Sequence, residues 1–399
     1  MNVEDQLIRR LVTRDDVALS GSGIGLLSFL FGWLTLKPSR IAAGTSLSLL
    51  ESVDWTAWAS VLALWVACLA LSFVGKGKLR AVALGIAANL IVVISLVYSG
   101  LAASILLEGE APFARVSLGA GVWMTLVGAY TVAFAARQRL GNSPVLRNLI
   151  SWTGLGVVLS LLLAGWFEDL SIVKEFMGRE ERFLQELLHH VYLVGISVAV
   201  GTLLGIFLGI WATRSRRAER PIFLITNITQ TIPSLALFGL LIAPLSALSF
   251  AFPTLREIGI RGVGNTPAII ALIIYALLPI VRNTYVGITQ LDPAVIDAGL
   301  GTGMSRSQVF RRIEAPLAAP IVLEGVRTAS VQSVGLAAVA ALIGAGGLGW
   351  FIFQGLGQAA SDLILLGAIP VIVLALIVDA VMRTVVRLAT PKGLAEGSQ

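Results

Sequence analysis

Ten stretches of about 20 mostly apolar residues recur along the chain, separated by short polar segments. They cover residues 17–36, 55–74, 81–101, 117–136, 149–167, 191–213, 222–246, 267–289, 322–345 and 362–386. Each is long enough and low enough in charge to cross the hydrocarbon core of a bilayer. Each is predicted to be helical, because lipid offers no hydrogen-bond partner to a bare peptide group. We therefore expect an all-α membrane protein with about ten transmembrane helices.

Composition supports the same fold class. Hydrophobic residues make up 56% of the chain and charged residues only 13%, whereas soluble domains usually carry about 25% charged residues. The net charge of +6 would also suit a nucleic-acid-binding protein, but the basic residues lie in alternate loops between spans. Cys68 is the only cysteine, so an internal disulfide is impossible.

The basic residues predict the orientation of the spans. Twenty of the 29 Lys and Arg residues fall on one side of the predicted membrane and eight on the other, with Arg282 inside a span. The richer side holds Arg9, Arg10, Arg14, Lys76, Lys78, Arg80, Arg137, Arg139, Arg147, Arg214, Arg216, Arg217, Arg220, Arg306, Arg311, Arg312, Arg327, Arg383, Arg387 and Lys392. Cytoplasmic loops are the basic ones. We therefore expect both termini in the cytoplasm and residues 290–321 to form a cytoplasmic loop.

Polar residues divide the chain into two units. The segment 168–190 is polar, and its apolar residues recur at helical spacing, so we predict an amphipathic linker helix on the extracytoplasmic side. Residues 1–167 form a five-span N-terminal unit whose role the sequence does not reveal. Residues 191–390 form a second five-span unit with more polar residues inside its spans.

Three glycines in the sixth predicted span share one helix face. Gly201, Gly205 and Gly209 follow one another at four-residue spacing. Small residues at this spacing let two helix backbones approach closely. The partner helix is either in the same chain or in a second subunit.

Polar residues inside spans seven to nine mark a candidate translocation pathway. They are Gln230, Thr231, Pro233, Ser234, Asn283, Gln332 and Ser333. Polar groups at membrane depth are costly unless they face protein or water, and proline frees a backbone carbonyl. Helices that line a pathway satisfy both constraints, as do kinks whose polar groups bond to neighbouring helices.

Other motifs do not indicate an enzyme. The glycine-rich stretch 344–358 lacks the strand and the acidic residue of a dinucleotide site, and we predict a turn with Trp350, Phe351 and Phe353 at the membrane interface. His189 and His190 point about 100° apart on a helix, so they cannot share a metal, and we expect both on the surface. We find no catalytic constellation and no metal site.

The cytoplasmic loop 290–321 has the signals of two short helices. Asp292 is a suitable N-cap with Pro293 in the first turn, and Ser305 is a second possible cap. Glycines at 299, 301 and 303 leave one surface small, while Val309 and Ile313 point away from Arg311 and Arg312. Such a protrusion suits docking into a partner's groove, although a solvated basic loop would also fit the sequence.

The spacing in this loop resembles the "EAA" loop of bacterial ABC importer permeases. That pattern is E-A-A, three residues, G, nine residues and I-x-L-P. The corresponding residues here are Asp297, Ala298, Gly299, Gly303, Ile313 and Pro316. Three positions depart from it: Asp297 replaces Glu, Gly299 replaces the second Ala, and Ala315 replaces Leu. Arg311 lies within the same loop. The shorter reach of Asp297 leaves open which contact its carboxylate makes.

Neighbouring segments are similar to the permeases of osmoprotectant importers for glycine betaine, carnitine and choline, over about residues 185–390. They include "QTIPSLALFGLLI" and "VRTASVQSVGLAAVAALIGAGGLG". The segments "KPSRIAAG" and "ARVSLGAGVWM" resemble a long branch of that family with extra N-terminal spans. The resemblance implies that residues 191–390 fold as the core of a type I ABC importer permease.

The same resemblance implies the partners. They are a cytoplasmic ABC ATPase, an extracytoplasmic substrate-binding protein and a second permease chain, in a bacterial cytoplasmic membrane. The chain has no G-x-x-x-x-G-K-[ST] motif, so we expect the partner to bind ATP and magnesium and this chain to hold no cofactor. The alternatives are a permease for another amino-acid-like solute such as D-methionine, or a secondary transporter without an ATPase.

Overall fold

The computed structural model describes residues 14–73, 77–141 and 143–391, and it falls into two compact units. Residues 1–178 form the first unit and residues 179–399 the second. The division lies within the segment predicted as a linker, but that segment is not a separate helix. Helix α8 (Ser171–Met177) closes the first unit, and Glu180 begins α9 (Glu180–Arg214), which runs on through the sixth predicted span. No Gly or Pro separates the polar turns of α9 from its apolar turns, so the helix continues.

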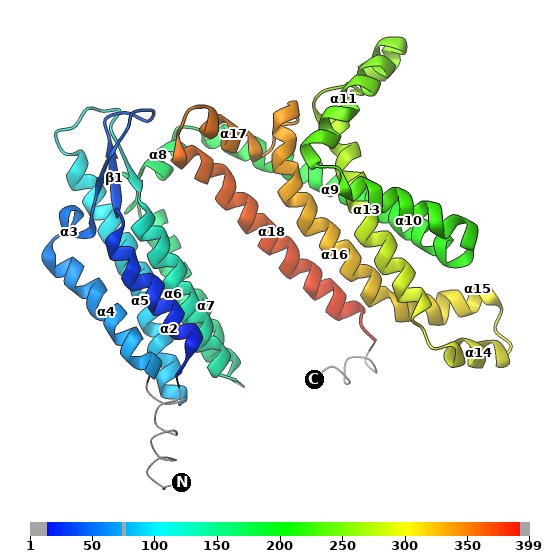
Figure 1. Ribbon diagram of the computed structural model, residues 1–399, viewed down its shortest axis with the longest axis horizontal. Coiled ribbons are helices and arrows are strands. Elements are labelled where there is room, and N and C mark those ends of the chain that lie inside the picture. Colours follow the sequence, from blue (N-terminus) through cyan, green and yellow to red (C-terminus); the bar gives the residue numbers. More distant parts are fainter. Residues whose placement is uncertain (1–13, 74–76, 142, 392–399) are drawn as a thin grey trace, which may run out of the picture. The chain divides into compact units, whose positions relative to one another are not determined.

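The first unit is a helical bundle (Figure 1). Its other helices are α2 (Asp16–Leu27), η1 (Ser28–Leu30), α3 (Leu49–Ser52), α4 (Trp55–Phe73), α5 (Lys78–Leu107), α6 (Ala120–Arg139) and α7 (Pro144–Leu163). Trp65 of α4 is fully buried in the core. Its ring fits only because Gly25 lacks a side chain, since a Cβ there would lie 2.2 Å from Trp65 Cε2. Packing around this large side chain holds α2 and α4 together.

A three-stranded antiparallel sheet lies at one end of this bundle. Strand β1 (Leu34–Lys37) pairs with β2 (Thr45–Leu47) and with β3 (Arg115–Leu118), in the order β2-β1-β3. The predicted span 17–36 is therefore wrong beyond Leu30. Leu34 and Leu36 alternate with Thr35 and Lys37, which is the period of a strand, and Leu34 opposes both Leu47 and Leu118.

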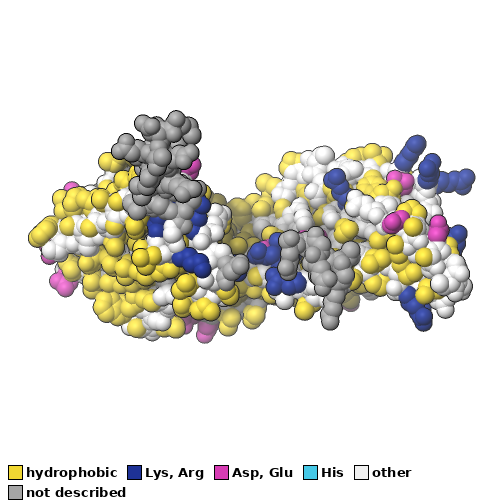
Figure 2. All heavy atoms as spheres, turned by 90° about the horizontal axis from the view of Figure 1, so that it is seen from below, with side chains coloured by type: hydrophobic (Ala, Val, Ile, Leu, Met, Phe, Trp, Pro, Cys, Tyr) yellow, Lys and Arg dark blue, Asp and Glu magenta, His cyan; other side chains and the backbone are white. Residues whose placement is uncertain are grey.

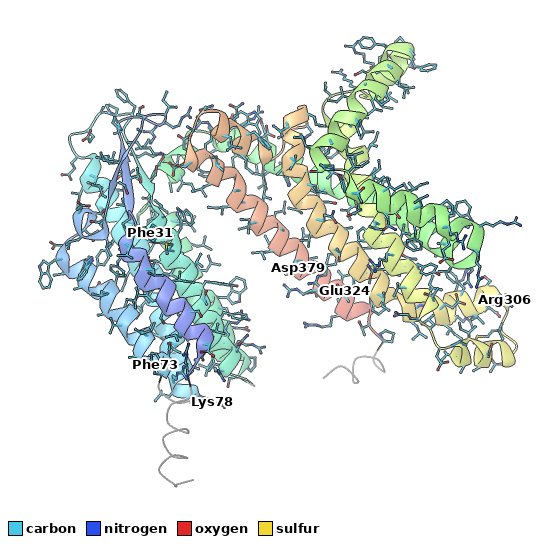
Figure 3. The ribbon with its side chains drawn as sticks, viewed as in Figure 1. Phe31, Phe73, Lys78, Arg306, Glu324 and Asp379 are labelled. Carbon is cyan, nitrogen blue, oxygen red and sulfur yellow. The ribbon has the colours of Figure 1, made fainter. Side chains whose placement is uncertain are left out.

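The other end of the first unit is held by a buried carboxylate. Asp15 is 3% exposed and caps α2, accepting a hydrogen bond from the Ala18 N–H at 3.3 Å. It also pairs with Arg80 of α5 at 3.5 Å and with Arg139 of α6 at 3.2 Å. Lys78 lies at this end, and Phe31 lies toward the other (Figure 3). One acidic side chain thus ties three helices together at the end predicted to be cytoplasmic.

The second unit contains the remaining helices. They are α10 (Arg216–Thr231), α11 (Ser234–Ala251), α12 (Pro253–Glu257), α13 (Asn265–Thr289), α14 (Pro293–Gly301), α15 (Arg306–Val309), η2 (Phe310–Glu314), α16 (Ala315–Val339), η3 (Ala340–Ile343), α17 (Gly349–Gly357) and α18 (Ser361–Ala389). Helix α13 packs mainly against α9 and α16, and α16 packs against α18. The predicted span 222–246 is wrong as one helix, because α10 ends at Thr231 and α11 starts at Ser234, on either side of Ile232 and Pro233.

The all-helical membrane fold class is confirmed, with the small sheet as an addition. Among the described residues, eight helices are long and apolar enough to span a bilayer, and Asp16–Leu30 is a shorter apolar helix. Figure 2 views the chain from below, where Lys and Arg side chains are seen beside extensive hydrophobic surface. Arg9, Arg10, Lys76, Lys392 and both termini lie outside the described residues, so the predicted location of the termini stays a prediction.

Candidate coupling loop and translocation pathway

The first helix of the cytoplasmic loop begins as its sequence predicts. The Asp292 side chain accepts a hydrogen bond from the Ala294 N–H at 2.9 Å, and Pro293 is the first helical residue of α14. Both features are local, because a capping carboxylate satisfies a free N–H and proline needs no donor in the first turn.

The second helix follows a sharp turn at Gly303. Gly303 has φ +86°, a conformation that L side chains rarely adopt. Ser305 then forms a capping box with Gln308: the Gln308 N–H donates to Ser305 Oγ at 3.3 Å, and the Ser305 N–H donates to Gln308 Oε1 at 2.8 Å. Helix α15 passes into the single π-helical turn η2 and then directly into α16. Turns of this kind inside helices are frequent at functional sites.

Glycine 299 explains how the two short helices lie against each other. It is buried, and a Cβ added to it would lie 2.6 Å from Ile313 Cδ1 and 3.4 Å from Val309 Cγ2. The glycine that departs from the family pattern therefore lets Ile313 lie against α14. An alanine here would require the flexible end of Ile313 to move.

The remaining motif residues face outward. Asp297, Ala298, Arg311 and Pro316 are exposed. Figure 3 shows Arg306 on the outer part of the loop. The motif thus separates into residues that shape the loop and residues that a partner can reach, and the docking role of the second group stays a prediction.

A cavity lies between the loop and the end of α9. Its volume is about 370 Å³, and it is lined by Ile210, Arg214, Ile296, Leu300, Arg306, Ser307, Val309, Phe310 and Glu314. The Arg214 guanidinium pairs with the buried Glu314 carboxylate and lies 5.7 Å from the centre of the Phe310 ring. The sequence analysis missed this pair, because its members are 100 residues apart and no local pattern joins them.

The three glycines of α9 face α13 of the same chain. A Cβ on Gly201 would lie 2.9 Å from Ala276 Cβ, one on Gly205 2.7 Å from Ile280 Cγ2, and one on Gly209 2.5 Å from Thr284 Cβ. Of the two alternatives, the structure therefore places a helix of the same chain, α13, against this glycine face.

Hydrogen bonds join the proline site in α13 to the break between α10 and α11 at Pro233. Pro279 has no N–H, so the Tyr275 carbonyl, four residues earlier in α13, loses its helical donor. The Gln230 side chain supplies one, donating from Nε2 to Tyr275 O at 2.8 Å. The Tyr275 hydroxyl in turn donates to Ile232 O, at the break between α10 and α11.

Other predicted pathway residues are also engaged with backbone groups. Asn283 Nδ2 donates to Pro279 O at 2.8 Å, and Thr231 Oγ1 donates to Ile228 O at 2.7 Å. Pro233 is exposed and precedes α11, and Ser234 is half-buried at its start. Gln332 is half-buried, whereas Ser333 is 1% exposed and its Oγ has no hydrogen-bond partner among the described residues. A lining role for this set stays a prediction.

The glycine-rich turn after α16 is held by α9, through a histidine that was predicted to be on the surface. His190 is fully buried, so that prediction was wrong. Its Nε2 lies 3.0 Å from Val334 O and its Nδ1 accepts a hydrogen bond from the Leu348 N–H at 3.3 Å. Glu186, one turn earlier, accepts a hydrogen bond from the Gly347 N–H at 2.6 Å.

Aromatic side chains next to this turn are partly buried. Phe351 is 0% exposed and packs near Phe183, so it does not face lipid, and its position at the membrane interface stays a prediction. The Arg182 guanidinium lies 4.7 Å from the centre of the Trp350 ring. Within the part of the chain that the structure describes, no three His, Cys, Asp or Glu side chains are grouped to hold a metal ion.

Helices α16 and α18 are joined by an ion pair that the sequence analysis also missed. Arg327 Nε donates to Asp379 Oδ1 at 2.7 Å, and Arg327 also pairs with Glu324 at 3.0 Å. Figure 3 shows Glu324 on α16 and Asp379 on α18. Asp379 is the only carboxylate inside the tenth predicted span besides Asp362 at its first residue, and that isolation was a signal that it needs a partner.

Comparison with known proteins finds a family similar to each unit. Residues 201–390 match the family described as "Binding-protein-dependent transport system inner membrane component", and residues 13–173 match "ABC transporter permease YehY, N-terminal domain". A solved structure of the inward-facing MetNI methionine ABC transporter has a TM-score of 0.46 and 21% identity, over 52% of this chain and 96% of that one. This likeness carries no functional argument.

Three curated relatives are more similar in sequence. The Bacillus subtilis glycine betaine/carnitine/choline transport system permease protein OpuCB is 39% identical over 55% of this chain and 97% of the relative. The choline transport system permease protein OpuBB of the same organism is 39% identical over 56% and 95%. The Salmonella typhimurium osmoprotectant import permease protein OsmW is 38% identical over 51% and 90%. With relatives at this identity matched over nearly their full length, the chain belongs to the binding-protein-dependent permeases, the inner-membrane subunits of ABC importers.

Proposed function

We propose that this chain forms the translocation pathway for glycine betaine or a related quaternary-amine osmoprotectant. The observation that carries the proposal is the similarity of the second unit to relatives named for glycine betaine, carnitine and choline. A quaternary ammonium group is attracted to aromatic faces by about 0.5–2 kcal/mol per ring. Most of that recognition belongs to a separate extracytoplasmic binding protein that delivers the solute.

The energy comes from a separate cytoplasmic ATPase that docks on the loop 290–321. The exposed Asp297, Ala298 and Arg311 offer the contact surface, and Gly299, Gly303 and Ile313 fix its shape. The partner binds ATP and Mg²⁺, so this chain is not itself an enzyme and carries no cofactor. A second permease chain completes the pathway between the two subunits, and both termini lie in the cytoplasm.

Co-purification tests the docking role with a matched pair of glycines. Gly301 and Gly303 are both exposed, and a Cβ on either meets nothing within 4 Å, but only Gly303 has a positive φ. Gly303→Val should therefore release the ATPase from the purified complex, whereas Gly301→Ala, which adds only one methyl group and keeps the surface small, should retain it. Asp297→Lys should also release it, by reversing an exposed charge. Full retention of the ATPase by both Gly303→Val and Asp297→Lys would contradict the docking role.

Uptake tests the solute. Membrane vesicles that contain the whole importer should accumulate radiolabelled glycine betaine, choline or carnitine when supplied with ATP and the binding protein. Accumulation of an amino acid such as D-methionine instead would overturn the solute class while leaving the ATPase role intact.

A further inference from the structure

Helix α9 makes a charged contact with the coupling loop at its cytoplasmic end, between a buried carboxylate and a half-exposed guanidinium. Glu314 is 5% exposed, and the Arg214 guanidinium that pairs with it is the last residue of α9. The contact falls on η2, the π-helical turn between α15 and α16. The loop is joined covalently to α13 and α16, so this pair adds a third helix to those that its movement would reach.

The same helix holds the glycine-rich turn at its other end. Glu186 and His190 lie one turn apart, are 6% and 0% exposed, and accept hydrogen bonds from the consecutive N–H groups of Gly347 and Leu348. The second ring nitrogen of His190 faces the Val334 carbonyl and so carries the proton. These contacts satisfy backbone donors that no helix engages, because Gly346 and Gly347 both have positive φ and lie outside any helix.

An unbroken helix joins the two contacts. Glu186 and Arg214 are 28 residues apart, which corresponds to about 42 Å of helix and exceeds the bilayer core of about 30 Å. Gly201, Gly205 and Gly209 lie between them and bring α9 close to α13. Helix α9 contains no proline, so its backbone hydrogen bonds are not interrupted.

We infer that α9 is a rod that links the coupling loop to the glycine-rich turn, with Arg214, Glu314, Glu186 and His190 as positioning residues. A displacement of the loop moves Glu314 and, through Arg214, the whole of α9. That movement changes the hold of Glu186 and His190 on residues 344–348. The cavity of about 370 Å³ beside the Arg214–Glu314 pair leaves space for α14 and α15 to shift. This inference rests on the proposed docking of an ATPase on the loop.

A consequence is that the two ends are coupled in both directions. If nucleotide binding to the ATPase shifts an equilibrium between two states of the turn, then a substitution that favours one of those states must shift the affinity for the nucleotide. Couplings of this kind are typically about 5–150-fold. The two ends can therefore be tested independently.

The test uses the permease–ATPase complex in nanodiscs with a spin label near the turn. Cys68→Ser removes the native cysteine, and Leu342→Cys, at a position 47% exposed, carries the label. The mobility of the label is compared with and without ATP and Mg²⁺. Arg214→Glu and Glu314→Arg should each reduce the ATP-dependent change about fivefold or more, and the double variant should restore it. Arg217→Gln, a charge loss at an exposed position in the next helix, should leave it unchanged.

The reverse direction uses the other end of α9. Glu186→Gln and His190→Asn should change the affinity of the intact complex for ATP, although both lie on the opposite side of the predicted membrane from the loop. The ATP-affinity measurement also tests the rod if Arg214→Glu does not yield a folded complex. A full label response in both single variants, failure of the double variant to restore it, or unchanged ATP affinity at the other end would overturn the rod.

Failure of the proposed function has a different signature. If wild-type chain binds no ATPase, or its label shows no response to ATP, the docking proposal fails first. If the wild type responds and Arg214→Glu responds equally, only the rod is refuted.

Discussion

Helix α9 offers a comparison of one substitution at two sites. A Cβ on Gly209 would lie 2.5 Å from Thr284 Cβ and 3.0 Å from the Val281 carbonyl oxygen, whereas a Cβ on Gly195 meets nothing within 4 Å. Ordinary Cβ contacts are 3.4–4 Å, so Gly209→Ala must separate α9 from α13. Because part of the obstacle is backbone, no side-chain rotation relieves it.

The expected change in the free energy of unfolding combines two opposing effects. Replacing Gly by Ala inside a helix stabilises it by about 0.8–1 kcal/mol. Overfilling a packed contact costs about 1–3 kcal/mol. Gly195→Ala should therefore raise the free energy of unfolding by up to about 1 kcal/mol, while Gly209→Ala should lower it by about 0–2 kcal/mol. The difference between the two variants isolates the contact with α13 at about 1–3 kcal/mol.

Thermal unfolding of the detergent-solubilised chain measures this difference. For a unit of 150–250 residues, 1 kcal/mol shifts Tm by about 2–4 °C, so the two variants should differ by about 2–12 °C. Equal Tm values would refute close packing of α9 on α13. If Gly209→Ala instead left Tm unchanged and dissociated a permease dimer, the glycine face would belong to a subunit interface.

Three further predictions concern other contacts. Gln230→Leu leaves the Tyr275 carbonyl without a donor and should lower the free energy of unfolding by about 1–3 kcal/mol, measured by thermal unfolding against Thr229→Val as a control. Asp15→Asn removes the carboxylate charge that joins Arg80 and Arg139 and should lower the free energy of unfolding by about 3 kcal/mol, the low end for buried pairs because the Arg139 side chain is 40% exposed; proteolysis of the first unit would report it, and unchanged resistance would contradict it. The side-chain and backbone hydrogen bonds of Ser48 lower the pKa of Glu51, so the α3 cap is present above the ordinary carboxyl pKa and is lost as pH falls through the lowered value. The Ser48 N–H donates to the Glu51 carboxylate, so its protection from hydrogen exchange should fall there, and Glu51→Gln should remove the pH dependence.

The sequence predicted those features whose causes are local. Asp292, Pro293 and Ser305 each act on groups within three residues, so the starts of both loop helices could be placed before the structure was known. The break at Pro233 was harder, because a proline either kinks or ends a helix. The outcome depends on which group bonds to the backbone at the break. Here the Tyr275 hydroxyl donates to Ile232 O, 43 residues away in the sequence.

Long-range polar pairs escaped prediction for a physical reason. Arg214–Glu314, His190–Leu348 and Arg327–Asp379 each join groups from elements far apart in the sequence. A single polar residue in an apolar run shows that a partner is required, but not which one. The strand β1 was missed because a four-residue alternation is weak beside a long apolar run.

The polar residues of spans seven to nine differ in whether their hydrogen-bonding groups already have partners in the structure. Gln230 and Asn283 donate hydrogen bonds to backbone carbonyls near Pro279, so their side chains stabilise the helices even when no solute is bound. Ser333 and Thr284 are buried on α16 and α13, and their hydroxyls have no hydrogen-bond partner among the described residues. A buried hydroxyl without a partner is unfavourable in a static chain. A conformation that exposes the hydroxyl to water removes that cost, which is what alternating access would do. Ser333 and Thr284 are therefore better candidates than Gln230 for groups that meet the pathway only when the helices move.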